Sequence, residues 1–219
     1  MKPLCVLFIH HADDELTRFH ADSIVTLNPA AVFVPLTFRM GFPAAVRPLT
    51  LDVGDVEHWN VDRLVYHWFL SPNRVDAARY LIIEYDTLCT IPFCEFYQEV
   101  WDRPVAGASF TTWATEPGWY WFQQISTPEI FQDKLAGIIP ISGILLSHSA
   151  LSTMAELAAE TRFDPLYCEC RIGTLANTTG FPLTQIRADA QDYIHWKVRV
   201  PDRPGIWHPV KMKTTLPSH

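Results

Sequence analysis

The 219-residue sequence predicts an α/β domain with a mixed, mostly parallel central sheet flanked by helices. Two observations carry this prediction. Residues 3–9 form an unbroken apolar run, and the predicted strand at 79–83 holds four apolar residues in succession, as expected of strands buried on both faces of a parallel sheet. Apolar residues at helical spacing over 14–27 separate the first run from another at 31–36, and this order gives a strand–helix–strand unit.

The rest of the first half continues the alternation of strands and helices. Asn28-Pro29 ends the first helix, because proline cannot continue it. A stripe of apolar residues predicts a second helix over 57–70. We expect a short helix over 92–100 and a further strand over 103–110.

The second half is less regular. Its aromatic stretch, 113–122, is predicted to be a loop that enters a helix, and 137–146 a strand or turn. Residues 147–160 predict a clear helix, whereas the last fifty residues, punctuated by proline and glycine, predict few regular elements. Neither a repeat nor a linker divides the chain, so 1–219 is predicted to be a single domain.

Composition and charge exclude several classes of protein. The chain has 17 basic and 24 acidic residues, and this acidic balance argues against general nucleic-acid binding, which needs a broad basic face. No stretch has the roughly 18–20 unbroken apolar residues of a membrane-spanning helix. The apolar start is interpreted as a first strand, since a small-residue cleavage site is missing. The expected location is therefore the cytoplasm.

Two carboxylates follow the predicted strand at 79–83. Glu84 and Asp86 come directly after its apolar residues, and ligands of open α/β sheets bind at the carboxyl ends of the strands. Carboxylate oxygens suit Mg²⁺ or Mn²⁺, and such a cation neutralises a diphosphate. The alternative is an acidic pair that caps a turn or binds an arginine.

A second candidate segment, Gly-Ile-Trp-His-Pro-Val-Lys, spans 205–211. His208 offers an imidazole ligand and Lys211 a positive charge for phosphate. A surface histidine beside a proline turn is the alternative.

The third segment spans 166–176 and places Glu169 just before a predicted helix. A carboxylate at this point could act as a general base aimed into a cleft. It could equally be a favourable charge at the helix N-terminus.

Together the three segments resemble the GT-A glycosyltransferases, a Rossmann-like superfamily that uses nucleotide-sugar donors. In that superfamily an Asp-x-Asp-type motif follows a central strand, and its last Asp binds the divalent cation and the donor diphosphate. A histidine near the C-terminus often completes the metal shell. The resemblance implies that Asp86 and His208 hold Mn²⁺ or Mg²⁺, assisted by Glu84, which departs from the commoner first Asp. It also implies that Lys211 contacts the diphosphate.

The segment around Glu169 is similar to that of the branching N-acetylglucosaminyltransferases and peptide O-xylosyltransferases. In those inverting enzymes the glutamate deprotonates the acceptor hydroxyl, which implies that Glu169 is the catalytic base. They work without a metal, so this similarity opposes the metal assignment. In a retaining enzyme Glu169 would instead bind the acceptor or be structural.

The GT-A resemblance also implies a division of labour along the chain. Residues 1–110 would bind the nucleotide-sugar, with UDP favoured as the nucleotide. Residues 111–219 would bind a carbohydrate or other hydroxyl acceptor and supply the C-terminal metal and diphosphate segment. The implied donor contacts are His10, Thr37, Arg39, Asn60 and Asp62.

Aromatic residues and a glycine turn are the candidates for the acceptor. Trp119 and Trp121 offer flat rings for the apolar face of a pyranose, although packing in the core would also explain them. Gly143, in the turn 140–143, would let the backbone approach a sugar closely.

Two other functions remain open. The run His11-Ala12-Asp13-Asp14-Glu15 is similar to the His-Pro-Asp-Asp-Glu motif of zinc-dependent N-acetylglucosaminyl deacetylases. That similarity implies a Zn²⁺ site at His11 with Asp13 and Asp14 as ligand and base. Alternatively the run is an acidic helix N-terminus. A third possibility is a protein that binds a nucleotide-sugar without catalysis.

Overall fold

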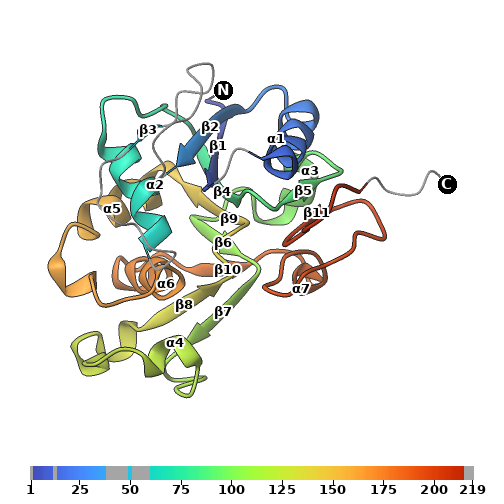
Figure 1. Ribbon diagram of the computed structural model, residues 1–219. Helices are drawn as coiled ribbons and strands as arrows, with labels where there is room; N and C mark the ends of the chain where they lie inside the picture. The colour runs from blue at the N-terminus through green and yellow to red at the C-terminus, as the bar shows by residue number, and fades with distance from the viewer. Residues whose placement is uncertain (1, 12–13, 38–48, 51–59, 215–219) are drawn as a thin grey trace.

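The computed structural model describes residues 2–11, 14–37, 49–50 and 60–214. Its centre is a seven-stranded sheet in the order β10-β6-β9-β4-β1-β2-β3 (Figure 1). β9 runs antiparallel to both of its neighbours, and the other pairs are parallel, which confirms the predicted mixed, mostly parallel α/β fold. The strands are β1 (Leu4–His10), β2 (Val32–Thr37), β3 (Leu49–Thr50), β4 (Arg79–Glu84), β6 (Val105–Gly107), β9 (Ile144–Ser147) and β10 (Leu183–Gln185).

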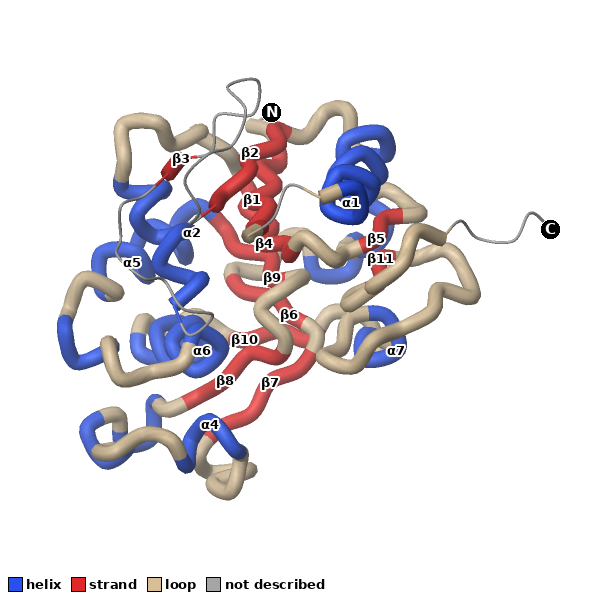
Figure 2. The backbone as a smooth tube through the Cα atoms, viewed as in Figure 1, coloured by secondary structure: helices blue, strands red, loops and turns tan. Residues whose placement is uncertain are grey.

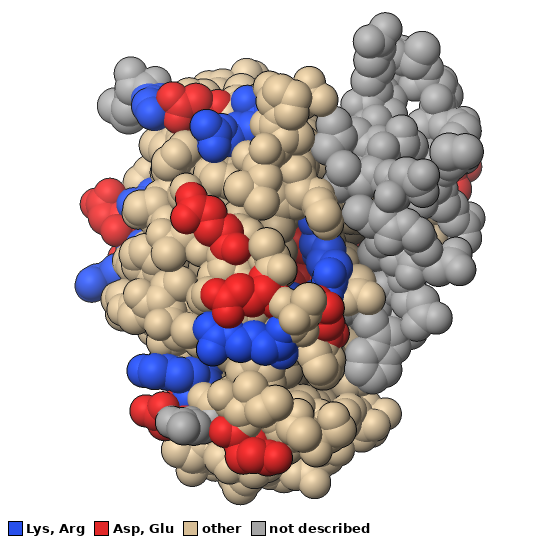
Figure 3. All heavy atoms as spheres, turned by 90° about the vertical axis from the view of Figure 1, so that its left-hand side faces the viewer, with Lys and Arg blue, Asp and Glu red and all other residues tan. Residues whose placement is uncertain are grey.

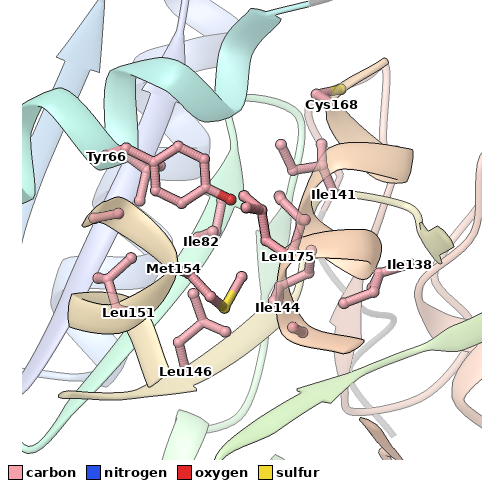
Figure 4. Close-up of a cluster of buried hydrophobic side chains, with 14 of the residues drawn as sticks. Tyr66, Ile82, Ile138, Ile141, Ile144, Leu146, Leu151, Met154, Cys168 and Leu175 are labelled. Carbon is pink, nitrogen blue, oxygen red and sulfur yellow. The ribbon is translucent and has the colours of Figure 1, made fainter. Parts of the chain in front are cut away.

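Helices cover both faces of this sheet (Figure 1). Along β4 the side chains alternate, because successive residues of a strand point to opposite faces. Tyr80 and Ile82 join the core on one face of the sheet, under α2 (Val61–Leu70), α5 (His148–Leu157) and α6 (Cys168–Thr178). Leu81 and Ile83 join the core on the other face, under α1 (Glu15–Leu27), α3 (Phe93–Phe96) and α7 (Ala190–Tyr193). Figure 4 shows part of the core under α2, α5 and α6.

Two small sheets extend the central one. β7 (Ser109–Thr112) and β8 (Ala136–Ile139) form an antiparallel pair beside α4 (Tyr120–Gln123), as Figure 2 shows. β5 (Leu88–Cys89) pairs with β11 (Ile206–Trp207), which brings the C-terminal segment back to the end of β4. The described part of the chain also contains the 3-10 turns η2 (Gln98–Val100), η3 (Pro128–Ile130), η4 (Gln132–Lys134) and η5 (Thr161–Phe163).

The structure corrects three of the predicted elements. The strand expected over 103–110 is two strands, β6 in the central sheet and β7 in a small sheet. Residues 137–146 contain most of β8 and β9 with a turn between them. Glu169 lies in the first turn of α6 rather than before it. The central sheet also takes strands from both the 1–110 and the 111–219 halves.

The surface mixes charges of both signs. On the face seen in Figure 3, Lys and Arg side chains lie interspersed with Asp and Glu. Such a face differs from the broad basic surface that nucleic-acid backbones require. Within the described residues, no helix combines the length and apolar character needed to cross a membrane.

Candidate functional site

The end of β4 places two carboxylates at the carboxyl edge of the sheet. Glu84 is the last residue of the strand, and the Thr87 N–H donates to its carbonyl at 3.1 Å, which closes the turn that carries Asp86. The Asp86 side chain is only 5% exposed. Its backbone carbonyl accepts from the Val210 N–H at 2.8 Å, so the C-terminal segment is fixed beside it.

That segment brings His208 against both carboxylates. The buried imidazole has its Nε2 at 3.1 Å from Glu84 Oε2 and at 3.2 Å from Asp86 Oδ1. Its Nδ1 lies 2.8 Å from the His195 carbonyl, which can only accept, so Nδ1 carries a proton. Burial lowers the pKa of His208, but the hydrogen bonds to Asp86 and Glu84 raise it to about 10.

Lys211 adds a second positive charge. Its ammonium group pairs with Asp86, donates to the Tyr85 hydroxyl at 2.9 Å and lies 4.7 Å from the centre of the Tyr85 ring. Burial raises the pKa of Asp86, but His208 and Lys211 lower it to about 2. The predicted quartet of Glu84, Asp86, His208 and Lys211 is therefore assembled from segments more than a hundred residues apart.

The oxygen and nitrogen atoms of this quartet can be compared with the ligand atoms that a divalent cation requires. Ligand atoms at adjacent octahedral positions, with bonds of about 2.1 Å, stand about 3 Å apart, close to the two contacts of His208 Nε2. The Nδ1–H bond to a carbonyl is the usual support of a ligating histidine. In the described residues, however, no group of three or more His, Cys, Asp and Glu side chains forms a ready-made metal site. A cation would therefore have to replace the Nε2 proton.

Glu169 lies on α6, which is held closely against β8. A Cβ on Gly173 would stand 2.6 Å from the Ala136 carbonyl oxygen, so only glycine permits this approach. Beside it the Thr174 hydroxyl donates to the Ala136 carbonyl at 3.1 Å and accepts from the Ala136 N–H at 3.2 Å. These contacts fix the helix that carries Glu169.

The surroundings of Glu169 suit a proton acceptor. Burial, followed by the charge of Glu84, raises the pKa of Glu169 to about 8. Hydrogen bonds from the Ile141 backbone and the Trp121 side chain act in the opposite direction, as does the charge of His208. Glu169 is therefore close enough to the quartet to be affected by its charges.

The turn between β8 and β9 contacts both parts of the site. The buried Ser142 hydroxyl accepts from the Glu84 N–H at 3.1 Å and lies 2.9 Å from the Thr87 hydroxyl. The preceding residue, Ile141, is the one whose backbone bonds to Glu169. One turn thus fixes the end of β4 and the Glu169 carboxyl relative to each other.

Gly143, which was predicted to contact the acceptor, has a conformational role in the same turn. Its φ of +87° requires glycine, and a Cβ there would stand 2.7 Å from Ile194 Cδ1. Its N–H donates to the Ile82 carbonyl and its own carbonyl accepts from the Tyr97 hydroxyl. The residue is buried between strand and core, so its conformation and packing explain the glycine.

An aromatic pocket of about 630 Å³ opens beside Glu169. Trp121 stacks on Tyr167 with ring centres 3.8 Å apart and planes 15° apart, which fixes the orientation of its ring. Trp119 and Trp121 both line the pocket. The full lining is Glu116, Trp119, Tyr120, Trp121, Ile139, Tyr167, Glu169 and Trp196.

Two of the expected nucleotide contacts lie at strand ends. His10 and Thr37 are neighbours in register at the carboxyl ends of β1 and β2, and both are buried. Arg39 lies outside the described residues.

Asn60 and Asp62, two of the predicted donor contacts, both bind Arg171. The Asp62 carboxylate is completely buried and accepts from Arg171 Nη1 at 2.6 Å, and Asn60 accepts from Arg171 Nη2 at 2.9 Å. A buried arginine has to be paired, and these two side chains pair it. The Asp62 side chain has no exposed surface and pairs with Arg171, whereas the sequence predicted a contact with the nucleotide.

The acidic run after β1 begins a helix. The Asp14 carboxylate accepts from the Thr17 N–H at 2.7 Å and caps α1. His11 packs edge-on against the Tyr85 ring, with centres 4.4 Å apart. Asp13, the remaining member of the predicted zinc set, lies outside the described residues.

Several residues of the site were not predicted from the sequence. Ser142 and Tyr85 are joined to the quartet only by tertiary contacts, and Glu116, Tyr167 and Trp196 reach the pocket from separate segments. The apolar strand ends could have pointed to Tyr85, which stands between the two predicted carboxylates. Nothing in the sequence distinguishes the others from ordinary surface or core residues.

The comparisons with known proteins show no family for this chain. No protein-family model matches it, and no curated protein does. Among solved structures, it is similar to the galactosyltransferase LgtC in complex with donor and acceptor sugar analogues, with 14% identity, a TM-score of 0.47, and coverage of 86% of this chain and 74% of that chain. An active-site mutant of LgtC gives 14% identity and a TM-score of 0.46 over the same shares. A likeness at this level carries no argument about activity.

Proposed function

We propose that this protein transfers a glycosyl group from a nucleoside-diphosphate sugar to a hydroxyl acceptor. The observation that supports this function is the meeting of three distant segments: a carboxylate–imidazole–lysine quartet at the end of β4 lies close to a buried carboxyl with a raised pKa. The quartet would hold the diphosphate end of the donor, and Glu169 would face the acceptor. UDP is the favoured nucleotide only through the GT-A resemblance.

The charges of the quartet favour a cation as part of the donor site. With His208 protonated, the two carboxylates balance the imidazolium and the ammonium, so these four side chains have no surplus positive charge for a diphosphate. Replacement of the His208 Nε2 proton by Mn²⁺ or Mg²⁺ would create that surplus. Asp86 and His208 would hold the cation, with Glu84 assisting. The cation would supply electrostatic stabilisation of the diphosphate leaving group.

The side chains of this chain would then divide the reaction between them. Lys211 is partly exposed and would turn from Asp86 to a diphosphate oxygen. The acceptor hydroxyl oxygen forms the new bond to the anomeric carbon, and the bond from that carbon to the diphosphate oxygen breaks. The hydroxyl proton goes to Glu169, and the nucleoside diphosphate leaves with the electron pair of the broken bond. This assignment describes an inverting reaction.

The two other candidate functions receive less support. A zinc deacetylase would need Asp14 as ligand or base, but its carboxylate is used to cap α1. A protein that only binds nucleotide-sugars would not need a buried carboxyl at the wall of the aromatic pocket. We therefore keep glycosyl transfer as the proposal.

Calorimetric titration with UDP and GDP tests this function, first with Mn²⁺ and then with EDTA. We expect affinity that depends on the cation, followed by UDP release when sugar donors and saccharide acceptors are supplied. Asp102→Ala, at a fully exposed side chain, is the control for Asp86→Ala. Failure of every nucleotide and nucleotide-sugar to bind, with or without Mn²⁺, would overturn the proposal.

A further inference from the structure

The aromatic pocket beside Glu169 has a composition that selects a particular kind of ligand. We propose that it binds an acceptor bearing an ammonium group beside its sugar hydroxyls, that is, an amino sugar with a free amine. This inference rests on the proposed function for its use of Glu169 as the base. The binding preference itself depends only on the pocket.

The walls of the pocket are predominantly aromatic. Five of its eight lining residues are Trp or Tyr, and its volume of about 630 Å³ suits a small molecule. Aromatic faces stack on the apolar face of a sugar ring and also attract cations through their electron-rich surfaces. Tyr120, 60% exposed, and Trp196, 64% exposed, leave aromatic surface accessible for both contacts.

Two carboxyl groups line the pocket, and the exposed Glu116 gives it a negative character. Glu169 lies at its inner wall, and Glu116 is oriented by the Thr111 hydroxyl, which donates to its Oε2 at 3.0 Å. Among the described residues that line the pocket, none is Lys or Arg. An acidic sugar would be repelled by the Glu116 carboxylate, whereas an ammonium group would pair with Glu116 and contact the rings.

One ring at this pocket already has an ammonium group against it. Lys197 Nζ lies 5.0 Å from the centre of the Trp196 ring, within the range of a cation–π contact. The lysine is outside the lining and follows Trp196 directly in the chain. This contact is the intramolecular counterpart of the one proposed for the ligand. It also makes Lys197 a competitor for the incoming amine, so its removal should strengthen amine binding.

The test compares three monosaccharides that share the pyranose ring and differ in charge. D-glucosamine, D-glucose and D-glucuronate are titrated into the full-length protein at pH 6.5, and binding is followed by saturation-transfer NMR and tryptophan fluorescence. A cation–π contact together with an exposed ion pair predicts that glucosamine binds about tenfold more tightly than glucose. Glucuronate should bind most weakly.

Variants then identify which side chains cause the preference for glucosamine over glucose. Glu116→Gln should remove most of it, because the exposed side chain keeps its size and loses its charge. Glu156→Gln, on the exposed side of α5, is the matched control and should leave the preference intact. Lys197→Gln should increase glucosamine affinity. Equal affinities for glucosamine and glucose, or tighter binding of glucuronate, would overturn the inference.

The failure of this inference can be distinguished from failure of the proposed function. A protein that binds UDP with Mn²⁺ but does not prefer glucosamine keeps the transferase proposal and overturns the amine-binding pocket. A protein that prefers glucosamine in the pattern above but binds no nucleotide supports the pocket and overturns the transferase.

Discussion

The Ser142 hydroxyl accepts a hydrogen bond from the backbone N–H of Glu84 at 3.1 Å and thereby joins the β8–β9 turn to the end of β4. Since the neighbouring Ile141 bonds to Glu169, the relative position of the proposed cation site and the proposed base depends on one turn. A shared support of this kind keeps two catalytic groups in a constant geometry, which is the condition for efficient proton transfer at a bound substrate.

Ser142→Ala tests this support. The variant leaves the Glu84 N–H and the Thr87 hydroxyl without their buried partner, so we expect a loss of about 1 kcal/mol in the free energy of unfolding. We also expect cation-dependent nucleotide affinity to fall by roughly 10–100-fold, as for the loss of a support behind a ligand. Denaturant unfolding and calorimetry measure the two effects. Ser126→Ala, at an exposed residue, is the control, and a stability loss without any change in cation dependence would leave Ser142 a purely structural role.

Asp86→Asn tests the proposed cation site. The amide cannot supply the negative charge that a hard cation and His208 require, so we expect the Mn²⁺-dependent part of UDP affinity to disappear. Asp102→Asn should retain it, because that carboxylate is fully exposed and outside the quartet. Calorimetry with Mn²⁺ and with EDTA measures the difference. Unchanged cation-dependent affinity in Asp86→Asn would remove this residue from the site.

Glu169→Gln separates donor binding from proton transfer. The amide keeps the shape of the side chain but cannot accept the acceptor proton, so turnover should fall by roughly 10²–10⁴-fold with donor affinity retained. Glu99→Gln is the control. Turnover near that of the wild type would exclude Glu169 as the base and would favour a retaining reaction.

The same residue predicts the pH dependence of the reaction. A general base works in its ionised form, and burial together with the charge of Glu84 raises the pKa of Glu169 to about 8. We therefore expect kcat/KM to rise tenfold per pH unit below about pH 8 and to level off above it. Glu169→Gln should flatten this limb of the profile. A rate that is already constant from pH 6 upward would contradict the assignment.

Glu169 should also link stability to pH in the opposite direction. Its folded pKa lies above the ordinary value of 4.5, so between these two values the folded state holds a proton that the unfolded state has lost. The free energy of unfolding should therefore decrease as the pH rises from about 4.5 to 8. In Glu169→Gln this decrease should be smaller, so the variant should be more stable than the wild type at pH 8. Urea unfolding of both proteins at several pH values measures the difference.

The sequence was most informative where local pattern and burial agree. The unbroken apolar runs predicted β1 and β4 within one residue, and the Asn28-Pro29 stop predicted the end of α1. The position at a strand end pointed to Glu84 and Asp86, and the GT-A resemblance joined His208 and Lys211 to them; the fold brings all four together. The strands, the helix end and the strand-end carboxylates were accessible because each depends on residues that are neighbours in the chain.

Features that depend on contacts between distant residues could not be predicted. Gly143 was assigned to the acceptor, but its glycine is required by a positive φ and by Ile194, which is fifty-one residues away. Asp62 was assigned to the nucleotide because the sequence does not show that Arg171 folds against it. The strand at 103–110 divides into β6 and β7, because its two ends pair with different sheets. In each case a long-range partner decides the outcome.

The buried ion pair between Asp62 and Arg171 gives the last prediction. Arg171 also donates to the Phe163 carbonyl at 3.0 Å and to the Leu166 carbonyl, and it lies on α6 two residues beyond Glu169. Arg171→Met would leave these acceptors and a buried carboxylate without their donor. We expect a loss of about 3–5 kcal/mol in the free energy of unfolding, the range for breaking one side of a buried pair.

The expected loss of stability depends on the burial of the ion pair rather than on the loss of a charge alone. Lys2→Met breaks an ion pair with Asp76 whose side chains are 57% and 60% exposed, and such pairs contribute at most about 1 kcal/mol. The double variant Asp62→Leu/Arg171→Met should be more stable than Arg171→Met alone, since it removes the uncompensated carboxylate as well. Guanidinium unfolding of the three variants measures these differences. If Arg171→Met costs no more than Lys2→Met, the buried pair does not hold α6 in place, and the position of Glu169 must depend on the Gly173 and Thr174 contacts with β8 alone.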